Sequence, residues 1–102
     1  MPLPMGRGDT AQASKDEVVL KLGASGEYAR KCTIRNNGSN IVRALVNVGD
    51  TARFAGLCDS GKDIKIPGSG ASYTFEGIEC GDIANVGYRT DTGTCGIYIS
   101  AY

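Results

Sequence analysis

The sequence predicts an all-β domain: an antiparallel β-sandwich or a jelly-roll-like small barrel of about 7–8 short strands, with an extended N-terminal arm. Apolar or alternating runs of strand length recur along the chain, and turn-forming residues separate them. Glycine contributes 15 of the 102 residues without a G-X-Y period, which is typical of many turns between short strands. No apolar stretch sustains a 3.6-residue period, so no helix is predicted.

The first residues differ in composition from the rest and predict a division into two parts. Residues 1–16 are expected to form a flexible assembly arm, and residues 17–102 the β-sandwich domain. The arm contains two prolines, two glycines and no strand or helix period, and such termini are poorly ordered unless a neighbour holds them. Prolines reduce the entropy lost when an arm docks on a neighbouring subunit. The docking residues are expected to be Pro2, Leu3, Pro4 and Met5.

The first two strands are predicted at residues 17–22 and 28–35. Val and Leu dominate the first run, and glycines end it. The second run alternates, with one set of positions polar and the other set containing Cys32 and Ile34. Since successive strand residues point to opposite faces, these two side chains are expected to point inward.

A hairpin is predicted to follow. Asn-Gly within Asn36-Asn-Gly-Ser39 favours a type I′ turn, because these residues tolerate positive φ angles. Residues 41–48 are apolar on both faces, which is typical of a strand buried on two sides. Residues 51–57 are expected to form a short strand or an irregular crossing.

The C-terminal half predicts four further strands. Residues 63–66 form a strand that a proline stops, since proline cannot donate to a ladder, and residues 71–76 form the next. Residues 83–88 and 94–101 are predicted to form a closing pair joined by the turn at 90–93. The alternation within these strands predicts one shared core, made of Cys32, Ile34, Val46, Ile64, Ile66, Phe75, Ile83, Val86, Ile97 and Ile99.

Composition argues against several classes of function. The 11 basic and 11 acidic residues give zero net charge, whereas nucleic-acid binding normally requires a basic excess. Histidine is absent, which removes the commonest general base and the commonest metal ligand. A cysteine nucleophile would lack its usual activating base. We therefore expect no enzymatic activity and no cofactor or metal.

The four cysteines are expected to be mainly free, buried thiols. No basic and apolar signal peptide begins the chain, and no run of about 18 apolar residues could span a membrane. Synthesis in a cytoplasm then favours reduced thiols, with two disulfides as the alternative. The spacing does not fit a zinc site, because no two cysteines lie two to four residues apart. The cysteines are Cys32, Cys58, Cys80 and Cys95.

Five short segments form a recurring pattern of strands and turns: Ile34-Arg-Asn-Asn-Gly-Ser39, Ile66-Pro-Gly-Ser69, Tyr73-Thr-Phe75, Thr92-Gly-Thr94 and Ile97-Tyr-Ile99. In these segments the chain resembles small all-β virion proteins of tailed bacteriophages, which serve as head decoration (cement) or fibre proteins. The likeness covers roughly residues 28–102, and the four cysteines depart from the pattern.

The resemblance implies a non-enzymatic structural protein of the virion, made in the host cytoplasm. A homo-oligomer would bind the major capsid protein or other virion subunits, and many weak contacts would add up to stabilise the shell. The alternative is a receptor- or carbohydrate-binding module of a fibre or spike. Its ligand face would be an aromatic platform of Tyr73, Tyr88 and Tyr98.

Overall fold

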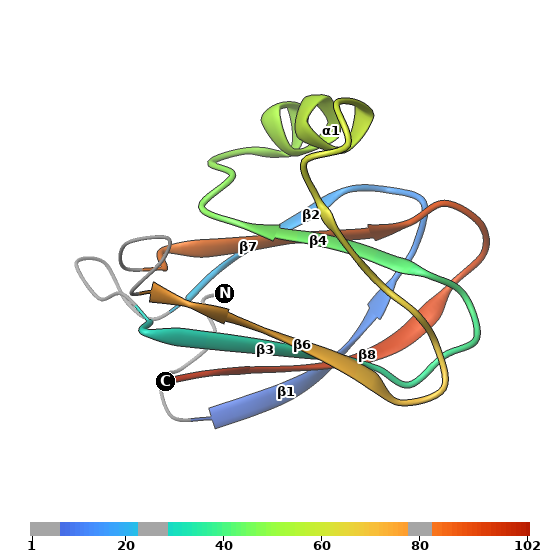
Figure 1. Ribbon diagram of the computed structural model, residues 1–102, viewed down its shortest axis with the longest axis horizontal. Coiled ribbons are helices and arrows are strands. Elements are labelled where there is room, and N and C mark those ends of the chain that lie inside the picture. Colours follow the sequence, from blue (N-terminus) through green and yellow to red (C-terminus); the bar gives the residue numbers. More distant parts are fainter. Residues whose placement is uncertain (1–6, 23–28, 78–82) are drawn as a thin grey trace.

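A computed structural model of the chain describes residues 7–22, 29–77 and 83–102 (Figure 1). This part contains eight strands and one helix. In chain order the elements are β1 (Arg7–Ala13), β2 (Val18–Lys21), β3 (Lys31–Asn36), β4 (Val42–Val46), α1 (Thr51–Asp59), β5 (Ile64–Ile66), β6 (Ala71–Glu76), β7 (Asn85–Thr90) and β8 (Cys95–Ala101).

The strands form two four-stranded sheets with the orders β1-β8-β3-β6 and β2-β7-β4-β5. Every pairing is antiparallel. Among consecutive strands only β4 and β5 pair with each other, and every other connection passes from one sheet to the other. This is the strand order of an eight-stranded jelly roll. The predicted all-β sandwich is therefore confirmed.

Two predicted strand pairs are wrong. β3 and β4 lie in different sheets, so Asn36–Ser39 turns a corner between sheets, and Gly38 does not have the positive φ of a type I′ turn. β7 and β8 are also in different sheets, and β8 pairs with β1 and β3 instead. A strand with one core-facing side has the same alternation in a hairpin and at a corner, so the pattern could not separate them.

The N-terminal boundary also differs from the prediction. Seven residues of the predicted arm form β1, which pairs with β8 along its whole length. Ala13 is fully buried, and Ala11 packs against the core. An edge strand needs few large apolar residues, so the composition of β1 is similar to that of a disordered terminus. Pro2, Leu3, Pro4 and Met5 lie outside the described residues.

A helix occupies the segment for which a short strand or irregular crossing was predicted. Asp50 caps α1 by accepting a hydrogen bond from the Arg53 N–H at 2.8 Å, as N-cap residues do. After the helix, Gly61 has a φ of 71°, and N–H groups of residues 61 and 62 return to carbonyls of residues 58 and 57. These two bonds form a Schellman motif. The sequence did not predict this helix, because a nine-residue helix with only two buried side chains is too short to show a 3.6-residue period.

The main core lies between the two sheets. Of the ten predicted core residues, nine are buried, and Ile64 is half-buried and packs against them. A second, smaller core consists of Val48, Phe54 and Cys58, and it lies between α1 and the outer face of the β2-β7-β4-β5 sheet. Figure 1 shows the resulting layers, with α1, the one helix of the described residues, on one side of the sandwich. No helix in the described ranges is long and apolar enough to cross a membrane.

Candidate functional surfaces

The three tyrosines predicted to form a ligand platform are not brought together. Tyr88 on β7 is 5% exposed and belongs to the core. Tyr98 on β8 lies on the outer face of its sheet, because the alternate residues Ile97 and Ile99 are buried. Tyr73 on β6 is opposite a buried isoleucine of β3, so it lies on the core-facing side of the same sheet.

The outer face of the β1-β8-β3-β6 sheet is polar, and no helix or strand of the described residues covers it. Its register aligns Thr10, Tyr98, Arg35 and Ser72 across the four strands. The hydroxyls of Thr33 and Thr74 lie 2.8 Å apart in a neighbouring row. We call this surface the open polar face; its residues are Thr10, Gln12, Lys31, Thr33, Arg35, Ser72, Thr74, Glu76, Tyr98 and Ser100.

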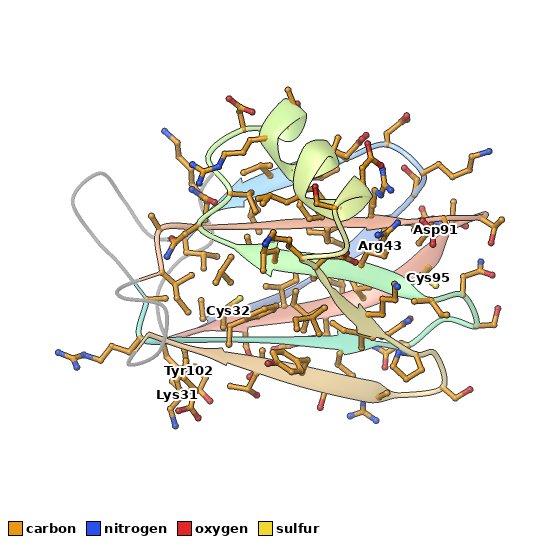
Figure 2. All side chains as sticks on the ribbon, turned by 45° about the horizontal axis from the view of Figure 1, so that its top comes forward. Lys31, Cys32, Arg43, Asp91, Cys95 and Tyr102 are labelled. Carbon is orange, nitrogen blue, oxygen red and sulfur yellow. The ribbon has the colours of Figure 1, made fainter. Side chains whose placement is uncertain are left out.

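The other sheet carries a network of charged side chains next to α1. Arg43 on β4 binds Asp63 through two hydrogen bonds, Nε to Oδ2 at 2.7 Å and Nη2 to Oδ1 at 3.0 Å. Its Nη1 also donates to Asp91 at 3.1 Å, and Figure 2 shows Arg43 and Asp91 close together beside the helix. The Asp63 side chain is 0% exposed, so this paired carboxylate is enclosed by protein.

Arg89 extends the network along β7. It is the direct strand neighbour of Arg43, and it forms ion pairs with Glu17 at 3.3 Å and with Asp91 at 3.8 Å. Asp91 therefore lies between two guanidinium groups that would otherwise repel each other across adjacent strands. The arginine–aspartate network consists of Glu17, Arg43, Asp63, Arg89 and Asp91.

The network ties the end of α1 to the sheet. Arg43 Nη2 donates to the Cys58 carbonyl at 2.6 Å, one of the last carbonyls of the helix, which have no partner within it. A cation there also interacts favourably with the helix dipole. The Arg43 guanidinium remains charged at neutral pH, so its contact with the end of the helix keeps its charge.

Proton affinities in the network reflect this pairing. Hydrogen bonds to Asp63 raise the pKa of Arg43, and this effect outweighs the opposing effect of burial. Burial alone would raise the pKa of Asp63, but the hydrogen bonds and charge of Arg43 outweigh it, so the pKa lies below its ordinary value of 3.8. Both groups are therefore held in their charged forms.

The described cysteines are buried free thiols, as predicted from the sequence. They are Cys32, Cys58 and Cys95, and Cys80 lies outside the described residues. Burial raises the pKa of Cys32 to about 12 and also raises the pKa of Cys58. A thiol must ionise to act as a nucleophile, so these environments disfavour reactivity.

Cys95 takes part in the corner between β3 and β4. Its Sγ donates to the Asn40 carbonyl at 3.1 Å and accepts from the Asn40 N–H at 3.2 Å. Buried Asn36 donates to the carbonyls of Asn40 and Ile66 and accepts from the Gly38 N–H. A Cβ at Gly38 would lie 2.6 Å from the Cys95 sulfur, so glycine is required by this close approach.

The arginine–aspartate network was not predicted, although the sequence contained one signal. Arg43 interrupts the apolar residues at 41–46, and a charge in a strand buried on both faces requires a partner. Its acids come from other loops, so their pairing depends on the tertiary fold. Among the described residues, no three His, Cys, Asp or Glu side chains gather as a metal site would require.

No protein-family model and no curated protein matches this chain. The site is therefore assigned from its own geometry.

Proposed function

We propose that the chain is a non-enzymatic virion structural protein, a capsid decoration or cement protein that binds the capsid lattice and stabilises the shell. The single observation that carries this proposal is the jelly-roll order of its eight strands. Double-sheet jelly rolls form viral capsid and lectin domains. The proposal thus rests on architecture, and the surfaces described above give it further support.

The open polar face is suited to a repeated contact with other subunits. It offers hydroxyl groups, one tyrosine and one arginine on one face of a sheet, and tyrosine and arginine are enriched in protein interfaces. A single contact of this kind would be weak. On a lattice many such contacts act together, so that the total stabilisation of the shell is large.

The titratable groups favour a structural role over catalysis. Asp63 and Asp91 are paired with arginines, and the raised thiol pKa values of Cys32 and Cys58 keep them protonated. A general acid or base needs a pKa near the working pH and access to a substrate proton. The enclosed carboxylate of Asp63 and the buried thiols of Cys32 and Cys58 lack these properties.

A carbohydrate-binding module is less well supported, although lectins share the jelly roll. The predicted platform of Tyr73, Tyr88 and Tyr98 is divided between the core, the core-facing side of β6 and the open polar face. Stacking on a sugar would need these rings on one surface.

The test is to measure the protein in purified particles. Particles from a lysate of the producing cells would be separated on a density gradient and analysed by quantitative mass spectrometry. We expect the chain to co-sediment with the shell at a fixed ratio to the most abundant shell protein. Recovery of the chain only in the fractions free of particles would overturn the proposal.

A variant tests the surface assigned to the contact. Arg35→Glu reverses a charge on the open polar face, whereas Lys62→Glu makes the same change at an exposed position beyond α1. Each variant would be added to shells from which the wild-type protein has been removed. We expect Arg35→Glu to lower the amount of protein bound to these shells and Lys62→Glu to leave it unchanged. Equal binding by both variants would show that this face is not used.

A further inference from the structure

Among the four edge strands of the described sheets, β6 is the one without features that prevent pairing. A sheet edge presents unpaired N–H and C=O groups, and proteins protect such edges with charges, prolines or short strands. β5 has three residues, one a lysine, and a proline follows it; β2 has four and ends in lysine. β1 carries an arginine and an aspartate. β6 has six residues with no charge before the last.

The backbone groups at the free edge belong to the even-numbered residues of β6. The Gly77 N–H donates to the Arg30 carbonyl, on the side that faces β3. In an antiparallel pair, hydrogen-bonded positions alternate along the strand. The odd-numbered residues of β6 therefore direct their N–H and C=O groups to β3. Those of Ser72, Thr74 and Glu76 point to the free edge.

The side chains of β6 leave aromatic surface exposed at the same edge. Tyr73 and Phe75 are on the core-facing side and pack edge to face, with ring centroids 4.8 Å apart. Phe75 is 5% exposed, but Tyr73 is 40% exposed although it faces the core. The sandwich therefore ends at β6 with an incompletely covered aromatic ring.

We infer that two copies of the chain pair through β6, antiparallel, about a two-fold axis at Tyr73. This register places Ser72 opposite Thr74 of the second copy, so the outward-pointing backbone groups of both strands meet and bond. The two Tyr73 rings face each other, and Phe75 meets Ala71 of the second copy. Aromatic and hydroxyl cross-strand pairs of this kind stabilise antiparallel sheets. The β1-β8-β3-β6 sheet of one copy and the same sheet of the second copy become one continuous sheet of eight strands.

Charge complementarity supports this register. Glu76 lies opposite Gly70 of the second copy, and the Arg35 guanidinium lies beside Gly70, with Nη2 3.3 Å from the place a Cβ on Gly70 would take. Each Glu76 thus approaches an Arg35 across the interface. The contact is isologous, the same patch on both copies, so it closes at a dimer. It goes beyond the proposed function, because it requires no shell.

The first test removes one backbone donor from the free edge. Ser72→Pro deletes an N–H that points away from β3, where an edge strand tolerates proline, whereas Ser72→Ala keeps the N–H. By sedimentation velocity we expect wild type and Ser72→Ala to dimerise. We expect the dissociation constant of Ser72→Pro to be raised by about tenfold or more, because two hydrogen bonds per dimer are lost. A wild type that remains monomeric at about 100 μM, or a folded Ser72→Pro that dimerises equally well, overturns the inference.

The second test leaves the backbone of β6 intact. Tyr73→Cys would place two thiols opposite each other at the axis, within the reach of a disulfide. The matched variant Gln12→Cys is on β1, at the other edge of the same sheet. With mild oxidant, we expect a covalent dimer from Tyr73→Cys and only the wild-type background from Gln12→Cys. Equal cross-linking of both variants, or none above background at residue 73, overturns the assigned interface.

Discussion

The two sheets of the sandwich differ in what lies on their outer faces. On the β2-β7-β4-β5 sheet, Val19 and Leu45 flank Gly87, and the Phe54 ring of α1 lies over this glycine. A Cβ on Gly87 would come within 2.8 Å of the ring. On the β1-β8-β3-β6 sheet the corresponding outward positions carry Thr, Ser, Tyr and charged residues, and no described helix covers them.

The difference shows that outward-facing residues decide whether a sheet needs a covering element. Both sheets have the same antiparallel ladder and share one core. Apolar side chains at outward positions gain free energy when an amphipathic segment covers them, at about 25 cal/mol per Å² of apolar area. Hydroxyl side chains are already hydrated and gain little. The helix-covered face is thus built for stability, and the open polar face remains available for contacts.

The largest loss of stability is expected from a substitution in the core that both sheets share. Ile97 is 1% exposed, so Ile97→Asp would bury an unpaired charge at a cost of several kcal/mol, similar to the total stability of a small domain. We expect the variant to be unfolded by circular dichroism. Gly96→Asp introduces the same side chain one residue earlier, where nothing lies within 4 Å of the added Cβ, and should stay folded. A native melting temperature for Ile97→Asp would contradict the core assignment.

The next effect separates the two outer faces directly. Phe54 is on the side of α1 that faces the sheet and is fully buried. Phe54→Ala should therefore lower the free energy of unfolding by about 3–5 kcal/mol. Tyr98→Ala removes an aromatic ring from the open polar face and should cost about 1 kcal/mol or less. Urea denaturation of both variants measures the difference. If both variants lost the same free energy of unfolding, the helix would not stabilise the sheet it covers.

A smaller, pH-dependent effect is expected from the arginine–aspartate network. Because the pKa of Asp63 is lower in the folded protein than its ordinary value of 3.8, its stabilising contribution is complete above that value. It is lost as the pH falls through the folded pKa. Asp63→Asn should cost about 3 kcal/mol at pH 7, because it removes the enclosed carboxylate of Arg43 and leaves only the exposed Asp91 as its charged partner. Melting temperatures from pH 7 to pH 2 should therefore fall less steeply in Asp63→Asn.

The control for this network is Asp59→Asn at the exposed end of α1. It removes a carboxylate without breaking an ion pair in the network, and its free energy of unfolding at pH 7 should change by about 0.5 kcal/mol or less. If Asp63→Asn and wild type show the same loss of stability on acidification, Asp63 is not the group responsible.

The smallest effect is a difference in thiol reactivity. Cys58 is on the buried side of α1, whereas Cys32 and Cys95 lie in the core between the sheets. Opening of a short helix costs less free energy than opening of the whole sandwich. Alkylation of the native protein, followed by peptide mass spectrometry, should therefore modify Cys58 before Cys32 and Cys95. Simultaneous modification of the three would mean that the helix and the sandwich unfold as one unit.

Much of the fold could be predicted because burial leaves a local pattern. The alternation in the strands identified the core positions, including Ile34, Phe75 and Ile97. The glycine and proline positions identified most of the breaks between strands. The helix left a weaker signal, since Asp50 and Gly61 mark its ends but only Phe54 and Cys58 of its nine residues are buried.

The surfaces could be predicted only in part, because they join residues far apart in the sequence. Asp63 and Asp91 reach Arg43 from loops 20 and 48 residues away, and no local pattern records that distance. Each of the three tyrosines, Tyr73, Tyr88 and Tyr98, lies in a segment predicted to be a strand. Tyr88 is nevertheless in the core, whereas Tyr98 lies on the open polar face. The side of the sheet that each ring takes depends on its register with neighbouring strands.

Alternation and turn chemistry act over a few residues, so the all-β class, the turn positions and the residues that face the core could be predicted from local patterns. Strand pairing, the addition of β1 to its sheet and the position of α1 over one outer face depend on contacts between distant residues. A hairpin and a corner bury the same alternating side chains, so the local pattern does not distinguish them. The choice between them is made by packing across the whole core, where each strand meets partners distant in the chain.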